Sequence, residues 1–186
     1  MTKTIKALGF CAFSLLLPAA AFGDEINCIG TLRGSFDNVN VPAARTCTLV
    51  DSRVQGSVYV RGNAALNVQR TVIIGNIQAE GARFVRLQGG SVAVNGSVQI
   101  KYGTGASSVA AGSMIGGSIQ YEENTGALSV SGARIGQDLQ VFKNFGGASI
   151  FNNTINGNLQ CKENDPAPVG SGNSVGGNKE DQCAGF

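Results

Sequence analysis

Residues 115–120 read Ile-Gly-Gly-Ser-Ile-Gln, and the unit returns as Ile-Gly-Gln-Asp-Leu-Gln at 135–140 and as Ile-Asn-Gly-Asn-Leu-Gln at 155–160. Earlier copies are Val-Asn-Gly-Ser-Val-Gln at 94–99, Ile-Gly-Asn-Ile-Gln at 74–78 and Val-Gln-Gly-Ser-Val-Tyr at 54–59. The second apolar residue of the unit recurs at intervals of 19 to 21 residues. A fixed period of this length predicts a solenoid, in which each repeat is one coil stacked on its neighbours.

Short alternations of apolar and polar residues indicate that each coil is built from strands. They occur at 58–60, 98–100 and 139–141, and a second set follows at 66–68, 85–87, 128–130 and 148–150. Alternation of this kind is typical of a strand with one buried face. We therefore expect an all-β, single-domain parallel β-helix of about seven coils, with about twenty residues in each coil.

Glycine and asparagine mark the expected turns between these strands. Two columns keep a twenty-residue step: Gly116, Gly136, Asn156, Gly176 and Gly112, Gly132, Asn152, Gly172. Both residue types tolerate positive φ, so we expect left-handed backbone in both columns. A third column, Asn124, Asn144 and Asn164, predicts a ladder of stacked side-chain amides along the axis; the alternative is that asparagine is simply common in turns.

The N-terminus has the three parts of a bacterial Sec-type signal peptide. Lys3 and Lys6 precede an apolar run over 7–17, and small residues lead to an expected cleavage after Gly23. We expect residues 1–23 to be removed and residues 24–186 to form the β-helix, with caps at 24–41 and 164–186. Phe36 is a candidate plug in the first cap. The mature protein is expected to be secreted or periplasmic.

Four cysteines remain after the leader, and in an exported chain an even number predicts disulfides. Cys28 and Cys47 are 19 residues apart and Cys161 and Cys183 are 22 apart, close to one coil in each case. Residues one coil apart stack on adjacent strands at roughly 4.8 Å, within disulfide range. We expect one disulfide at each end, Cys28–Cys47 and Cys161–Cys183.

Composition excludes several classes of function. Without the two leader lysines the chain has equal numbers of acidic and basic residues, which gives no electrostatic case for a nucleic-acid partner. No stretch has the ~20 apolar residues of a transmembrane helix. Histidine is absent, and disulfide-bonded cysteines cannot hold zinc, so we expect no metal, no cofactor and no enzymatic activity. The alternative, a polysaccharide lyase or hydrolase, would use Glu123 with Glu163, or Asp138.

One outward strand face carries the candidate binding residues. Its column consists of Tyr59, Gln78, Gln99, Gln120, Gln140 and Gln160, beside a second column of Ser57, Asn76, Ser97, Ser118, Asp138 and Asn158. A flat, regular surface of amides and hydroxyls could bind a polysaccharide or a protein. With Tyr59, Tyr102 and Tyr121 as stacking groups it would be a carbohydrate-binding module. The alternative is that the glutamines only stabilise the sheet.

Both cysteine-bearing ends carry a resemblance to known proteins. The opening Val-Pro-Ala-Ala-Arg-Thr-Cys-Thr-Leu at 41–49 and the closing segments 157–164 and 176–183 resemble a set of uncharacterised exported bacterial β-helix proteins. The resemblance implies the β-helix and brings no site residues. The coils are also distantly similar to bactofilins, polymer-forming β-helix proteins.

The combined expectation is an exported, non-enzymatic β-helix with a structural or adhesive role at the cell surface or in the extracellular matrix. Its expected partners are a polysaccharide or a surface or matrix protein. We expect a monomeric rod because both ends are capped, with end-to-end association through strand edges as the alternative.

Overall fold

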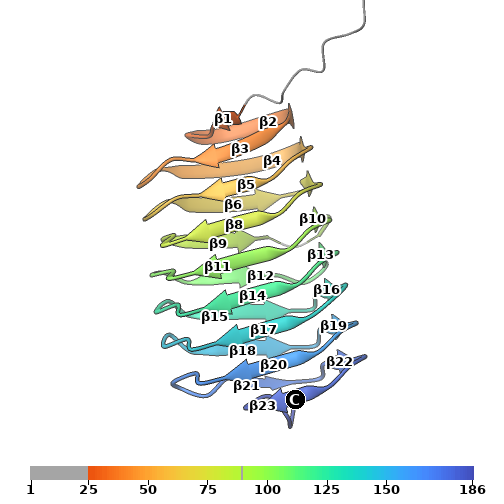
Figure 1. Cartoon of the computed structure of the whole chain (residues 1–186). Coiled ribbons are helices and arrows are strands. Elements are labelled where there is room, and N and C mark those ends of the chain that lie inside the picture. The colour runs from red at the N-terminus through yellow and green to blue at the C-terminus, as the bar shows by residue number, and fades with distance from the viewer. Residues whose placement is uncertain (1–24, 89) are drawn as a thin grey trace, which may run out of the picture.

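The computed structural model describes residues 25–88 and 90–186, which form a stack of about eight coils (Figure 1). Every strand pairing is parallel and joins one coil to the next, and paired residues are about twenty apart. The exception is the first pairing, of 25–27 with 38–40, in which partners are 13 residues apart. This confirms the parallel β-helix predicted from the repeat. The predicted leader lies outside the described residues.

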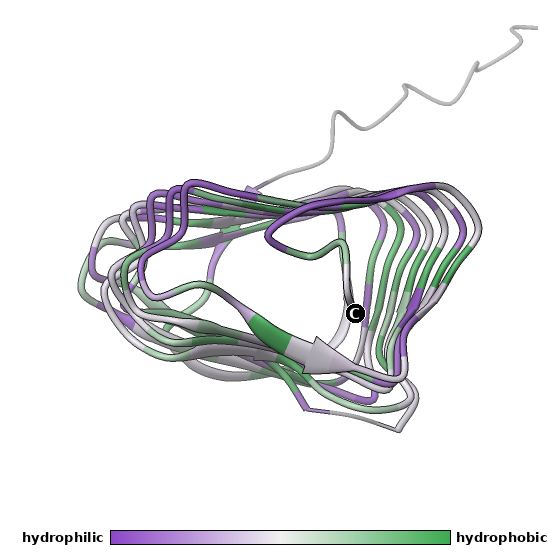
Figure 2. Cartoon of the chain, turned by 90° about the horizontal axis from the view of Figure 1, so that it is seen from below, coloured by the Kyte–Doolittle hydropathy of each residue, from purple (hydrophilic) through white to green (hydrophobic). Residues whose placement is uncertain are grey.

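Three strand faces enclose the core and give the coil a triangular cross-section (Figure 2). Face 1 is a nine-stranded sheet. Its strands are β1 (Glu25–Asn27), β3 (Asn38–Val41), β5 (Val58–Val60), β8 (Ile77–Glu80), β11 (Val98–Lys101), β14 (Ile119–Glu122), β17 (Leu139–Phe142), β20 (Leu159–Lys162) and β23 (Lys179–Asp181).

Faces 2 and 3 share one strand, because β4 pairs with β6 through its first half and with β7 through its last two residues. Face 2 contains β2 (Gly30–Phe36), β4 (Thr46–Val54), β6 (Ala65–Gln69), β9 (Phe84–Leu87), β12 (Ser107–Val109), β15 (Leu128–Ser131), β18 (Ala148–Phe151) and β21 (Val169–Ser171). Face 3 contains the two-residue strands β7 (Val72–Ile73), β10 (Ala93–Val94), β13 (Met114–Ile115), β16 (Arg134–Ile135), β19 (Thr154–Ile155) and β22 (Ser174–Val175).

The apolar anchors of the repeat form the core. Val58, Ile77, Val98, Ile119, Leu139 and Leu159 are fully buried in one column of face 1. Val68, Leu87, Val109, Val130 and Ile150 form the equivalent column of face 2. Because each coil adds the same inward positions, burial continues from coil to coil along the rod as far as Leu159 and Ile150.

The two predicted turn columns have different physical origins. Gly112, Gly132, Asn152 and Gly172 have positive φ, as predicted, at the corner between faces 2 and 3. The prediction for Gly116, Gly136, Asn156 and Gly176 was wrong, because none of them has positive φ. A Cβ on Gly136 would lie 2.1 Å from the carbonyl oxygen of Gly116 in the preceding coil. Close approach between coils therefore favours glycine there.

Two ladders of buried asparagines run along the inside of the corners. In the predicted one, Asn124 donates to Asn144 Oδ1 at 2.8 Å and Asn144 donates to Asn164 Oδ1 at 2.9 Å. The second ladder was missed: Asn153 donates to Asn173 Oδ1 at 2.9 Å at the corner between faces 2 and 3. In both ladders the same oxygens also accept the backbone N–H of the preceding asparagine.

A disulfide lies near each end of the rod, with the predicted pairing. The Cα atoms of Cys28 and Cys47 are 5.4 Å apart, and those of Cys161 and Cys183 are 5.3 Å apart. Phe36 near the first end and Phe186 near the second pack, partly buried, against the core. In the last coil Lys179 and Asp181 take the register positions of Leu159 and Cys161, so the apolar columns of face 1 end there.

Candidate functional site

The predicted glutamine column is one continuous outward row on face 1. Strand register aligns Tyr59, Gln78, Gln99, Gln120, Gln140 and Gln160 across β5 to β20. From Gln99 onward each amide donates to the next coil, at 2.7, 3.0 and 2.9 Å, and Gln160 donates to the Glu180 carboxylate at 2.7 Å. Bonds of this kind contribute roughly 0.5–1.5 kcal/mol each and fix the amide orientations. The amides of this row therefore have fixed orientations before any partner binds.

The second predicted column lies at the corner before face 1 and binds backbone. Ser57 accepts the N–H of Asn76 at 3.0 Å, and Asn76 Oδ1 accepts the N–H of Ser97 at 2.8 Å. The pattern continues to Asp138 Oδ1, which accepts the N–H of Asn158 at 2.7 Å. These side chains connect successive coils, so their main contacts are within the rod.

The three tyrosines expected to stack on a ligand lie in three different environments. Tyr59 is half-buried on face 1, and Tyr102 lies at a corner with half of its surface exposed. Tyr121 is fully buried in the core, so its assignment as a stacking group was wrong. Its place in β14 explains this, since it follows outward Gln120 and must point inward. Burial raises the pKa of its phenol well above the usual range.

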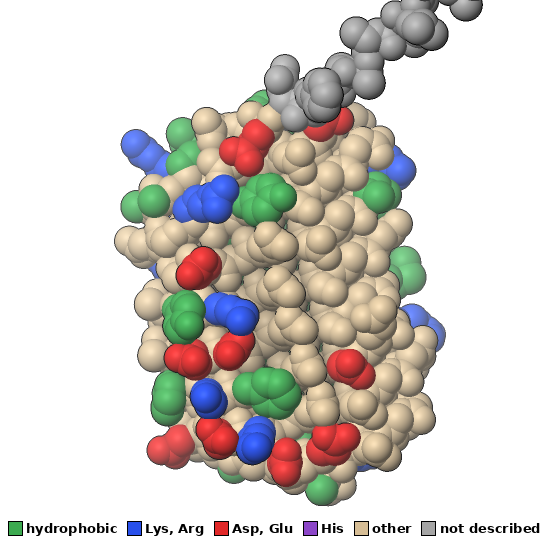
Figure 3. Space-filling model, in the orientation of Figure 1, with side chains coloured by type: hydrophobic (Ala, Val, Ile, Leu, Met, Phe, Trp, Pro, Cys, Tyr) green, Lys and Arg blue, Asp and Glu red, His purple; other side chains and the backbone are tan. Residues whose placement is uncertain are grey.

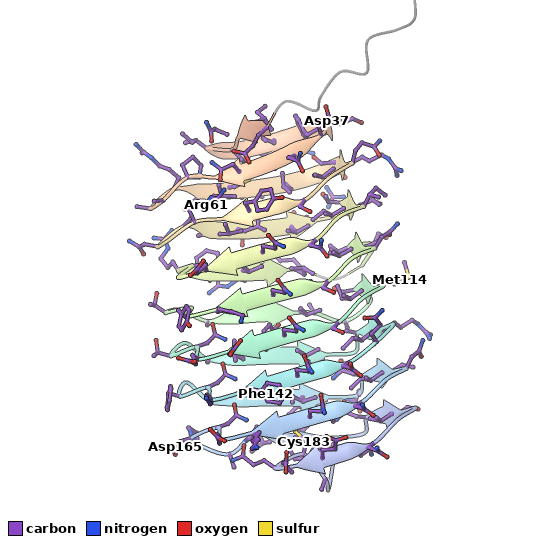
Figure 4. All side chains as sticks on the ribbon, viewed as in Figure 1. Asp37, Arg61, Met114, Phe142, Asp165 and Cys183 are labelled. Atoms are coloured by element: carbon purple, nitrogen blue, oxygen red, sulfur yellow. A yellow bond between two sulfur atoms is a disulfide. The ribbon has the colours of Figure 1, made fainter. Side chains whose placement is uncertain are left out.

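Phe142 is an aromatic group of face 1 that was missed. It is the last residue of β17, two positions after Gln140, and therefore points outward on the same face. Figure 4 shows it on face 1 in the C-terminal half of the rod. The alternation over 139–142 already contained this signal.

Charged side chains gather along the edge where the strands of face 1 end, whereas the middle of the face is largely uncharged (Figure 3). Lys101 and Glu122 pair across β11 and β14, and this contact raises the pKa of Lys101 above its usual value. Glu163 lies 4.0 Å from both Lys143 and Lys162. The edge is thus charged but locally balanced.

A shallow depression of about 430 Å³ opens in the N-terminal half of face 1. It is lined by the side chains of Tyr59, Arg61, Gln78, Glu80, Gln99 and Lys101. The Arg61 guanidinium carbon lies 5.3 Å from the centre of the Tyr59 ring, and Arg61 Nε donates to Asn40 Oδ1 at 2.8 Å. These side chains come from β5, β8, β11 and the residue after β5.

The carboxylates considered for polysaccharide cleavage either contact other groups of the rod or lie at its corners. Asp138 binds a backbone N–H, and Glu163 lies between two lysines. Glu123 stands at a corner with φ of 53°, a position that Lys143 and Glu163 share in the next coils. Across residues 25–88 and 90–186, no cluster of three or more potential metal ligands occurs, and no helix is long and apolar enough to cross a membrane.

Comparisons of this chain with protein-family models, with curated proteins and with solved structures find no match.

Proposed function

We propose that this protein is an exported, non-enzymatic β-solenoid that acts as a structural or adhesive rod at the cell surface or in the extracellular matrix. The observation that carries the proposal is the row from Gln99 to Glu180, in which each amide is held by the next. A surface whose side chains are already ordered loses little conformational entropy when it meets a partner.

The shape of face 1 also supports contact with an extended partner. Its sheet continues over nine strands and its middle is polar and largely uncharged, so a polysaccharide chain or the surface of a matrix protein can lie along several coils at once (Figure 3). Repeated weak contacts along one face add up, as in other multivalent binders.

Export is supported by the disulfides and by the sequence of the N-terminus. Two disulfides near the ends of the rod favour an oxidising compartment, since cytosolic thiols are normally kept reduced. The signal-peptide pattern of residues 1–23, with Lys3 and Lys6 before an apolar run, favours the same location. A periplasmic or extracellular rod is the proposal that fits both.

The proposal is tested by measuring whether the protein is retained on such materials without cleaving them. Purified, oxidised residues 24–186 are incubated with cell envelopes, matrix proteins and insoluble polysaccharides, and bound protein is measured beside released reducing ends and unsaturated sugars. We expect saturable retention on at least one of these materials and no released product. Product release that disappears in Glu123→Gln or Asp138→Asn would replace this proposal with the lyase or hydrolase alternative, and no retention on any material would contradict adhesion.

A further inference from the structure

We propose that the depression in the N-terminal half of face 1 binds one unit of a neutral oligosaccharide. The inference rests on the proposed function, since it names a ligand for one part of the adhesive face. It differs from binding along the whole glutamine row, because the depression lies where that row is interrupted.

The interruption is at Gln78. From Gln99 to Gln160 every amide donates to its neighbour in the next coil, whereas Gln78 has no hydrogen-bond partner among the described residues. Gln78 is also the exposed member of the row. The Oε1 atom of Gln99 likewise accepts no hydrogen bond within the described part of the chain. Donors and acceptors for a ligand are therefore free at this one place in the row.

Tyr59 forms an aromatic wall beside these free groups. It is the register neighbour of Gln78, and Arg61 holds it through the ring contact at 5.3 Å. The hydrogen bond from Arg61 to Asn40 fixes the guanidinium in turn. An aromatic ring fixed next to a few directed polar groups is the usual composition of a small-molecule site.

The charges in the depression favour a neutral ligand. Arg61 and Lys101 contribute two positive charges, Glu80 contributes a negative one, and Lys101 is paired with Glu122 at the rim. Because these charges balance, neither an acidic sugar nor a cation gains net attraction. A sugar hydroxyl both donates and accepts, so it can use the Glu80 carboxylate, the Arg61 guanidinium and the Gln78 amide together.

The experiment compares two glutamines of the same row. Neutral hexasaccharides (β-1,4-glucose, β-1,3-glucose, α-1,4-glucose and β-1,4-mannose) and an oligogalacturonate are titrated into oxidised residues 24–186 by calorimetry. The proteins are the parent, Gln78→Ala, Tyr59→Ala and Gln140→Ala. Side-chain amide NMR signals are followed in the parent, and circular dichroism verifies the fold of each variant.

We expect one neutral hexasaccharide to bind and to shift the Gln78 amide signal. Affinity should fall roughly tenfold or more in Gln78→Ala and Tyr59→Ala and stay within about twofold in Gln140→Ala. Equal losses in Gln78→Ala and Gln140→Ala, preference for the oligogalacturonate, or no binding of any probe would overturn the sugar site. Retention on envelopes or matrix by a Gln78→Ala variant would leave the proposed adhesive function standing, so the two failures are distinguishable.

Discussion

Asn144 is bound twice to Asn164: its side-chain amide and its backbone N–H both donate to Asn164 Oδ1, at 2.9 and 3.0 Å. Asn144 Oδ1 accepts the same two groups from Asn124. One buried side chain thus satisfies polar groups in three successive coils, which explains why asparagine keeps an unbroken twenty-residue step at this corner.

Replacing Asn144 by alanine should therefore be costly. The backbone N–H of Asn124, which is fully buried, would lose its acceptor, and the Asn124 amide would keep only its bond to the Ile100 carbonyl. Each unsatisfied buried group costs roughly 1–3 kcal/mol. We expect a loss of about 2–4 kcal/mol in the free energy of unfolding, measured by urea denaturation. Asn156→Ala is the matched control, because Asn156 is exposed and should change stability by less than about 0.5 kcal/mol. Equal effects of the two variants would contradict the ladder.

Tyr121→Phe, in contrast to Asn144→Ala, should not lower the free energy of unfolding. The Tyr121 hydroxyl is buried in the core and has no hydrogen-bond partner among the described residues. Removing an unpaired buried hydroxyl removes its desolvation penalty, so we expect stability to be unchanged or to rise by up to about 1 kcal/mol. Tyr59→Phe, on the outer face, is the control for the loss of a hydroxyl. A clear destabilisation by Tyr121→Phe alone would mean that the hydroxyl has a bonding partner in solution.

Loss of the second disulfide should loosen one end of the rod only. In a solenoid each coil contacts its neighbours, so the effect of Cys161→Ala with Cys183→Ala should be confined to the last coils. We expect faster amide hydrogen exchange over β20 to β23 and unchanged protection over β8 to β14. The apparent stability of the end should fall by roughly 2–4 kcal/mol. Uniformly faster exchange along the whole chain would show that the coils unfold as one cooperative unit.

Asp51 should make the stability of the rod depend slightly on pH in the acidic range. It accepts hydrogen bonds from Arg70 and Arg33, and these contacts hold its pKa below the usual value. Because the folded-state pKa is lowered, the contribution is present above the unfolded pKa of about 3.9 and is lost as pH falls through the folded value. The melting temperature of the parent should exceed that of Asp51→Asn at pH 7 and approach it near pH 2. Asparagine tolerates the φ of 49° at this position. A difference that does not change with pH would show that the ion pairs contribute nothing measurable.

The fold was predictable because the repeat is nearly exact. A period of 19 to 21 residues places each apolar anchor on the one before it, and the same step chose the disulfide pairs and the Asn124–Asn144–Asn164 ladder. The second ladder was harder to see, since its column reads Ser52, Thr71, Val92, Ser113, Ala133, Asn153 and Asn173. Asparagine occupies only its last two positions.

The candidate site was predictable only as a row. Strand alternation placed the glutamines outward, but it could not show that Gln78 stays free while Gln99 and Gln120 bind each other. Glycine at 116 and 136 was assigned to backbone conformation, whereas the contact with the preceding coil decides it. Each of these differences depends on which atoms of the neighbouring coil lie within a few ångströms. Distances between atoms of adjacent coils cannot be read from a single sequence.

Two lysine substitutions in the same region of the rod test the central claim, adhesion through face 1, most directly. Gln120→Lys puts a charge in the middle of face 1, and Ser129→Lys puts one on the outward side of β15 in face 2. A charge buried in a contact without a partner is costly, so retention on the bound envelope or matrix material should fall roughly tenfold or more in Gln120→Lys and remain unchanged in Ser129→Lys. Equal retention of the two variants, with both folded, would contradict the assignment of face 1 as the adhesive surface.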